Sequence, residues 1–286
     1  MARPGPCYED RSRQVTHSLP DIVTFWRGPL DRLRQTCLRS QVAAGHKVIV
    51  YSFDPLPGLP DGVVNADAEA VLPYAFSERL RPPQPDGSWR DWTTLQYSDF
   101  FRIRLMAMNA GVWLDADVLL LRPVEIDRTK PYFAWERGRQ IGNSVIYFPP
   151  DDPVVREFEQ LIAQEELTPN WLSLSHRLTF ALQRLRGGSK RISDIRVAVY
   201  GPAALTALAR RHGTLRHALP KRSFYAVHSE PKAFFEPADF SSLLRDPAII
   251  GLHISPKGRA KQPPLPGSLF YWAAEHYGTL AWRPSI

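Results

Sequence analysis

The stretch GVWLDADVLLLRP, residues 111–123, places two aspartates, Asp115 and Asp117, inside an otherwise apolar run. The apolar residues on both sides predict a buried strand that ends at Pro123. An ionised carboxylate beside a core strand needs a partner, because its desolvation is costly. Residues two apart lie on the same side of an extended chain, so the two carboxylates can share one oxygen-preferring cation such as Mg²⁺ or Mn²⁺. The alternative is a tight turn between two strands, in which the aspartates serve the turn itself.

A helix is expected directly before this stretch. Apolar residues recur at roughly helical spacing between Trp92 and Gly111, and the glycine is a natural helix end. Asp99 and Arg102 are three residues apart and therefore share one face of this helix. Because helix, strand and aspartate pair follow one another directly, these two side chains are candidates for the wall of the same pocket. The alternative is a surface ion pair, which contributes little to stability.

The string SDFFR, which begins at Ser98, and the string NAGVWLDAD, which ends at Asp117, together resemble the D-x-D sugar-binding region of glycosyltransferase family 32. That family includes bacterial capsule and lipopolysaccharide glycosyltransferases and yeast-type initiating mannosyltransferases. This chain has Ala110 where the usual pattern has a first glycine, and Trp113 where it often has tyrosine. Weaker similarities extend the resemblance; they are DIVTFWRG (21–28), NSVIYFP (143–149) and YGPAALT (200–206).

The resemblance implies a GT-A fold, which is an α/β fold with a Rossmann-like nucleotide-binding mixed sheet flanked by helices and the D-x-D motif at a strand end. It also implies a nucleotide-sugar donor and Mn²⁺ or Mg²⁺. Asp117 would bind the metal directly, and Asp115 would hold the donor ribose or a metal-bound water. Asp99 and Arg102 would hold the donor sugar. Trp26 would lie against the nucleobase, although an aromatic residue at a strand end is more often part of the core.

A third metal ligand is expected from the C-terminal part of the chain. The segment AIIGLH (248–253) predicts a short strand that ends in His253, and Lys257 follows in a Pro/Gly turn. This arrangement is similar to the His-turn-Lys element of several metal-dependent GT-A enzymes. The similarity implies His253 as a metal ligand and Lys257 as a phosphate contact. His228 is the competing ligand, and an ordinary core or surface histidine is the alternative for both positions.

The catalytic groups are the least defined part of the sequence. The family resemblance implies retention of anomeric configuration, yet no aspartate or glutamate stands out as a nucleophile. Asn143 lies where such families often present a polar side chain to the sugar. Glu136 is the only carboxylate near it in the sequence and is a candidate acceptor contact. For each of the two residues, a merely structural role is the more common explanation.

The rest of the chain predicts alternating strands and helices. A strand over 22–25, a helix over 30–44 and a strand over 47–52 form the β-α-β opening of a nucleotide-binding sheet, whose ligand gathers at the carboxyl ends of the strands. One amphipathic helical segment is expected over 153–187. No linker is evident, so we expect an N-terminal extension over 1–18 and a single GT-A domain over the remainder, 19–286.

Composition is consistent with one compact enzyme. The chain has 286 residues and is 44% hydrophobic, which is enough for a substantial core. Its two cysteines, Cys7 and Cys37, are too few for a disulfide framework and favour a reducing compartment. There is no hydrophobic signal region and no apolar run of membrane-spanning length, so a cytoplasmic location is expected.

The formal net charge of +7 suits nucleic acid, an anionic membrane surface or phosphorylated substrates. No nucleic-acid-binding motif is present, so nucleic acid is not an expected partner; a nucleotide-sugar and a glycan or lipid-linked acceptor are. Basic residues cluster at 184–191 and 209–222. By default these clusters are solvated helix ends and loops. The alternative is that they hold the protein peripherally at the inner face of an anionic membrane.

The expected function is a Mn²⁺- or Mg²⁺-dependent hexosyltransferase. It would move a sugar from a UDP- or GDP-linked donor to an acceptor in bacterial cell-envelope polysaccharide synthesis. A diphosphate leaving group needs a Lewis acid at neutral pH, which supports the metal independently. Two alternatives stay open. In a haloacid-dehalogenase-type phosphatase, Asp115 would be the nucleophile and Asp117 the acid/base, although such motifs usually follow the first strand. In a non-catalytic protein, the same residues would only bind a nucleotide-sugar.

Overall fold

A computed structural model describes residues 18–80, 92–187, 197–228, 230–255 and 258–282. Almost all of the expected N-terminal extension, Cys7 and Lys257 therefore lie outside the described residues. Within them, no helix combines the length and the apolar character that crossing a bilayer requires.

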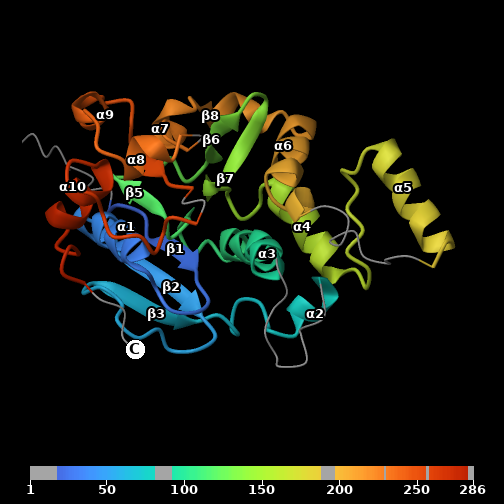
Figure 1. The fold of residues 1–286 in the computed structure, drawn as a ribbon. Coiled ribbons are helices and arrows are strands. Elements are labelled where there is room, and N and C mark those ends of the chain that lie inside the picture. Colours follow the sequence, from blue (N-terminus) through green and yellow to red (C-terminus); the bar gives the residue numbers. More distant parts are fainter. Residues whose placement is uncertain (1–17, 81–91, 188–196, 229, 256–257, 283–286) are drawn as a thin grey trace, which may run out of the picture.

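The fold is built on a mixed seven-stranded sheet with strand order β3-β2-β1-β4-β7-β6-β8 (Figure 1). The first four strands in this order are parallel, whereas β7 runs antiparallel to both β4 and β6, and β8 is parallel to β6. The α/β fold with a mixed sheet and helices around it is thus confirmed. The strands are β1 (Ile22–Phe25), β2 (Val48–Ser52), β3 (Val63–Asp67), β4 (Val112–Leu114), β6 (Tyr132–Arg137), β7 (Gln140–Tyr147) and β8 (Ala218–Leu219).

The two halves of the aspartate stretch belong to different sheets. β4 lies in the main sheet, but β5 (Val118–Leu120) pairs antiparallel with β9 (Gly251–His253) in a separate two-stranded sheet. Between them the chain turns, and the amide of Val118 donates to the carbonyl of Asp115 at 3.0 Å. The prediction of a single strand is therefore wrong, and so is the extended geometry from which we inferred that the two carboxylates share a side. The turn alternative describes the backbone correctly.

Helices surround the sheet, and their buried side chains form two hydrophobic clusters with it. The larger one joins most of the main sheet to α3, α4 and α6. The smaller one joins α1 to β5, β9 and α10, with Cys37, Leu119, Leu252 and Phe270 among its buried members. The helices are α1 (Arg32–Ala43), α2 (Phe76–Leu80), α3 (Thr93–Ala107), α4 (Pro153–Ala163), α5 (Leu174–Leu185), α6 (Pro202–Arg211), α7 (Arg222–Tyr225), α8 (Lys232–Phe235), α9 (Ser241–Arg245) and α10 (Leu269–His276), with short 3₁₀ turns at Val197–Val199 and Thr214–His217.

Most expected elements are present with slightly different bounds. The predicted β-α-β opening is β1, α1 and β2, and the predicted helix before Gly111 is α3. The expected helical segment 153–187 is instead two helices, α4 and α5. Pro169 lies between them, and proline cannot continue a helix because it lacks an N–H and clashes with the preceding turn. Ser173 then starts α5 by accepting a hydrogen bond from the amide of His176.

Gly111 has a different role from the helix end that the sequence predicts. α3 ends at Ala107 with Met108 as its C-cap, and Asn109 already has a left-handed φ of 50°. Gly111 has φ +150°, and a Cβ added there would lie 2.3 Å from the carbonyl oxygen of Asp21. The adjacent amide of Val112 donates to the same oxygen at 2.8 Å. Gly111 therefore lets β4 approach the start of β1.

We expect Gly111→Ala to lower the free energy of unfolding by about 3 kcal/mol, because backbone must move to admit the methyl group. Gly138→Ala is the matched control: that glycine also has a positive φ, +53°, but its Cβ would meet nothing within 4 Å. The control should cost about 1 kcal/mol of backbone strain. Urea unfolding of both variants measures the difference, and equal losses would contradict the close approach of β4 to β1.

Candidate functional site

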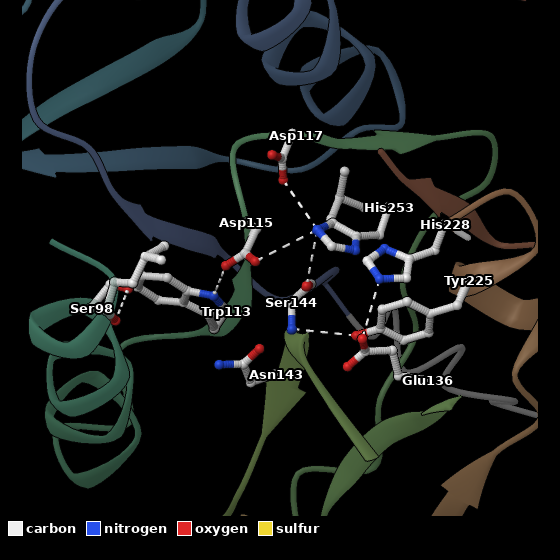
Figure 2. Close-up of polar contacts among 12 residues, drawn as sticks. Ser98, Trp113, Asp115, Asp117, Glu136, Asn143, Ser144, Tyr225, His228 and His253 are labelled. Atoms are coloured by element: carbon white, nitrogen blue, oxygen red, sulfur yellow. Dashed lines mark hydrogen bonds and ion pairs between the residues drawn. The ribbon is translucent and has the colours of Figure 1, made fainter. Parts of the chain in front are cut away.

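Asp115, Asp117 and His253 converge at the point where β4 leaves the main sheet (Figure 2). Asp115 follows β4 directly, and Asp117 precedes β5. His253 ends β9, where it pairs in register with Val118, and the next amide, that of Ile254, donates to the carbonyl of Asp117 at 3.0 Å. One ligand atom from each of the three side chains lies within 4.8 Å of the others. The structure thus brings the three predicted metal ligands together.

One oxygen of each aspartate accepts a hydrogen bond from a residue outside the cluster, and the other oxygen is directed at His253. Asp115 Oδ1 accepts a hydrogen bond from Trp113 Nε1 at 2.7 Å. Asp117 Oδ2 accepts one from Arg34 Nη2 at 3.1 Å. The remaining oxygens, Asp115 Oδ2 and Asp117 Oδ1, lie 3.9 and 3.4 Å from His253 Nε2. Two oxygens and one nitrogen are therefore oriented toward a common point by partners outside the cluster.

This donor set fits a divalent cation. Bonds of about 2.1 Å place neighbouring ligands about 3 Å apart, and small side-chain movements would bring the 3.4 and 3.9 Å separations seen here to that value. Carboxylate oxygens with one imidazole suit Mn²⁺ and Mg²⁺, with imidazole also favouring later transition metals. Ser144 Oγ lies 3.1 Å from His253 Nε2 and adds a further oxygen at the rim. Trp113 and Arg34 are outer partners of the kind that orient metal-binding side chains.

The charged groups of this cluster shift the pKa values of one another. Burial alone would lower the pKa of His253, but the hydrogen bond and charge of Asp117, with Asp115 and Glu136, raise it above its ordinary value. Burial alone would raise the pKa of Asp117, but His253 and Arg34 hold it below its ordinary value. When no metal is bound, the neighbouring carboxylates therefore favour the protonated form of His253.

Metal binding is therefore expected to release a proton. A protonated imidazole cannot ligate a cation, so affinity for Mn²⁺ should rise about tenfold per pH unit until the pH passes the pKa of His253, and then level off. Because that pKa is raised from 6.5, the rise should continue past pH 6.5 before it levels off. Calorimetric titration in buffers of different ionisation enthalpy counts the proton. His212→Gln, which removes a histidine paired with Glu157, should leave the count unchanged. Affinity that is flat across this range would contradict the assignment.

His228 and Glu136 lie behind His253 as seen from the aspartates (Figure 2). The ring of His228 stacks on that of His253, with centroids 4.7 Å apart and an 18° interplanar angle. His228 Nε2 lies 3.2 Å from Glu136 Oε1. His228 is therefore outside the converging set and packs against the ring of His253. Glu136 is engaged by His228, and its predicted contact with an acceptor stays a prediction.

A second cluster, formed by Asp99, Arg102 and Asn143, adjoins the first. Asp99 and Arg102 are only 5% and 4% exposed, so the alternative of a surface ion pair is wrong. Asp99 Oδ1 accepts a hydrogen bond from Asn143 Nδ2 at 2.7 Å and lies 3.6 Å from Arg102 Nη2. The same guanidinium nitrogen lies 3.7 Å from Asp115 Oδ1, and the guanidinium covers the ring of Trp113 at 4.6 Å. Arg102 thus connects the two clusters.

Asp99 has an unusual environment for a carboxylate. Burial raises its pKa to about 7, against the opposing effects of Arg102 and Asn143. Gly201 leaves room for it, because a Cβ there would lie 2.7 Å from Asp99 Oδ2. Near neutral pH, Asp99 can therefore both donate and accept hydrogen bonds. Gly201 belongs to the YGPAALT segment (200–206). One of the segments with weaker similarity to the family therefore also lies at the site.

Arg34 and Ser144 are site residues that the sequence did not reveal. Arg34 lies in the first turn of α1, donates to Asp31 at 2.8 Å and to Asp117, and places its guanidinium 5.1 Å from the Trp26 ring centroid. Trp26 therefore adjoins Asp117 through Arg34, and its stacking on a base stays a prediction. Only the position of Arg34 in the sequence could have indicated its role. It follows the carboxyl end of β1, where ligands gather in such sheets.

No family model matches the chain. Over 136 residues it is 29% identical to a retrovirus-related Pol polyprotein from type-1 retrotransposable element R2 of Popillia japonica. That match covers 43% of this chain, which spans about a fifth (19%) of the polyprotein's length. Among solved structures, the PaToxG glycosyltransferase is similar, with a TM-score of 0.44 and 12% identity, over 68% of this chain and 72% of that one. These likenesses are too distant to assign the chain to a family.

Proposed function

We propose that this protein is a divalent-metal-dependent glycosyltransferase that uses a nucleoside-diphosphate sugar. The observation that supports this best is the convergence of Asp115 Oδ2, Asp117 Oδ1 and His253 Nε2 beside a buried Asp99–Arg102 pair. When bound there, Mn²⁺ or Mg²⁺ would supply a Lewis acid for the diphosphate leaving group. A metal at Asp115, Asp117 and His253 would meet the diphosphate of such a donor. Asp99, whose pKa is raised to about 7, and Arg102 would meet its sugar.

Each residue then has a defined task. Asp115, Asp117 and His253 hold the metal, and Arg34 and Trp113 keep the two carboxylates aimed at it. Asp99, Arg102 and Asn143 contact the hydroxyls of the donor sugar; the buried guanidinium fixes the carboxylate and the asparagine as one unit. Trp26 lies against the nucleobase, and Lys257 neutralises a phosphate. These roles combine the observed geometry with the resemblance to glycosyltransferase family 32.

The finer assignments rest on that resemblance alone. They are a UDP- or GDP-linked hexose, transfer with retention of configuration, a glycan or lipid-linked acceptor contacted by Glu136, and a place in cell-envelope polysaccharide synthesis. The corresponding location is the cytoplasm or the inner face of the cell membrane. Asn143 would present its amide to the sugar during front-face attack.

A donor screen tests the proposal. The protein is incubated with UDP-, GDP- and TDP-sugars, with Mn²⁺ or with EDTA, and released nucleoside diphosphate is measured; p-nitrophenyl phosphate is assayed in parallel. Hydrolysis of one donor that requires Mn²⁺ is the expected result. Phosphatase activity without donor hydrolysis would replace the proposal by the dehalogenase-type reaction. Donor binding without turnover, with or without added acceptors, would leave the non-catalytic alternative.

A further inference from the structure

α5 presents an unusual surface, because four of its leucines face solvent. Leu174 and Leu185 are each 83% exposed, Leu178 is 63% exposed and Leu182 is 44% exposed. Their spacing of four, four and three residues places them along one side of the helix. We call these four residues the leucine stripe. Single exposed leucines are common in soluble proteins, but a continuous stripe of them marks an interaction surface.

The helix is attached to the protein by its other side. Phe180 is the one buried residue of α5, with 7% exposure. Arg184 covers the Phe180 ring at 5.6 Å and forms an ion pair with Glu166 at 2.9 Å. At 100° per residue, Phe180 lies roughly opposite the centre of the leucine stripe. The stripe therefore points outward, and in Figure 1 α5 lies at the edge of the molecule, beyond α4 and α6.

Basic residues flank the leucine stripe on both sides. Arg177 and Arg184 fall on one side of it and Arg186 on the other, by the same helical spacing. The sequence from Leu174 to Gly187 contains no aspartate or glutamate. The preceding Glu166 is already engaged by Arg184. The charged residues of α5 itself are thus all basic.

We propose that α5 docks this protein on an anionic membrane, with the leucine stripe buried among the lipid headgroups and chains. An amphipathic helix with a leucine face and arginines at its borders has the composition of helices that lie in the plane of the interface. α5 has no acidic residue that could pair with these arginines. Acidic lipids would supply the missing negative charge. A second copy of the chain fits less well, because packing two stripes together brings arginines near arginines, with no acidic residue on either α5 to pair with them.

The segment that precedes α5 is hydrogen-bonded to residues 199–200, which lie next to the candidate site. Trp171 Nε1 donates to the carbonyl of Val199 at 2.9 Å, and Tyr200 OH donates to the carbonyl of Leu167 at 2.8 Å. The next residue is Gly201, where an added Cβ would lie 2.7 Å from Asp99 Oδ2. Docking through α5 would therefore connect the lipid surface to the site through this segment, on the side where a lipid-linked acceptor would be found. Membrane docking itself does not depend on the proposed transfer reaction.

Vesicle sedimentation tests the proposal without metal or donor. The wild-type chain should bind vesicles of phosphatidylcholine with phosphatidylglycerol at least about tenfold more tightly than pure phosphatidylcholine vesicles. Replacing the leucine stripe with glutamine should weaken that binding by at least about tenfold. Leu265→Gln is the matched control, an exposed leucine (47%) outside α5, and should bind like the wild type.

A second variant separates the two contributions. Arg177→Gln with Arg186→Gln should reduce binding to anionic vesicles and its sensitivity to salt, while leaving the weak binding to neutral vesicles unchanged. Circular dichroism confirms that each variant is folded, which is expected because all substituted residues are exposed. The proposal is overturned if the wild type does not bind anionic vesicles, or if the glutamine variant binds them equally well. Self-association that is lost in the glutamine variant, without vesicle binding, would identify a second copy as the occupant.

Discussion

Asp117→Asn is expected to abolish both metal binding and turnover, with donor hydrolysis falling about 1000-fold. The substitution keeps the shape of the side chain but removes the negative charge that faces His253 at 3.4 Å. The amide oxygen can still accept the hydrogen bond that Arg34 donates, so the turn between β4 and β5 should persist. Loss of metal binding and turnover in this variant would then result from removal of a metal ligand and not from unfolding.

Two measurements define this result. Saturating Mn²⁺ should raise the melting temperature of the wild type, because a ligand that binds only the folded state stabilises it. It should leave the melting temperature of Asp117→Asn unchanged. Asp127→Asn is the control: that aspartate is exposed and pairs with Lys130 in a loop, so both its activity and its Mn²⁺ response should match the wild type. A full Mn²⁺ response in Asp117→Asn would remove this residue from the metal site.

Arg102→Lys is expected to reduce donor hydrolysis at least about 100-fold while preserving the response to Mn²⁺. The guanidinium donates through Nε to the carbonyl of Ser98 and through Nη2 to its hydroxyl, each at 3.0 Å, and it also donates to the carbonyl of Asn143. A lysine keeps the charge but cannot make this set of contacts. Asp99 and Asn143 would lose their common support, although Asp115, Asp117 and His253 stay in place.

The stability of this variant should fall by about 3 kcal/mol, because a buried hydrogen-bonded charge loses its matched partners. Arg104→Lys provides the control from the same helix. Arg104 is one-third exposed and pairs with Glu159, so its loss should cost less than about 1 kcal/mol and leave turnover unchanged. If the two lysine variants behave alike, Arg102 is a structural residue without a special place in the site.

Local sequence predicted the elements that carry the site. The β1-α1-β2 opening and the helix α3 follow from hydrophobic spacing and end signals that act within a few residues. The proximity of Asp99 and Arg102 to the aspartate pair follows from the direct succession of α3 and β4. His253 was predicted as a ligand by family resemblance, and the pairing of β9 with β5 supplies the reason for its position.

Long-range packing decided what the sequence did not reveal. Arg34 reaches Asp117 because α1 packs on β5, where Gln41 Nε2 donates to the carbonyl of Val118 at 3.0 Å and Ser40 Oγ accepts from the amide of Leu120 at 2.9 Å. No local pattern encodes that contact across 83 positions. The leucines of α5 show the converse case. An amphipathic pattern predicts that the apolar face meets the core, whereas in the structure Phe180 meets the core and the leucines face solvent.

The most direct test of the metal centre is a Mn²⁺ titration followed by electron paramagnetic resonance, with and without UDP or GDP. The free-ion signal reports unbound Mn²⁺. If Asp115, Asp117 and His253 form the donor's metal site, the wild type should bind one Mn²⁺ per chain, and one of the two nucleotides should tighten that binding. No binding by the wild type in the presence of either nucleotide, at a pH where His253 is neutral, would contradict the central claim.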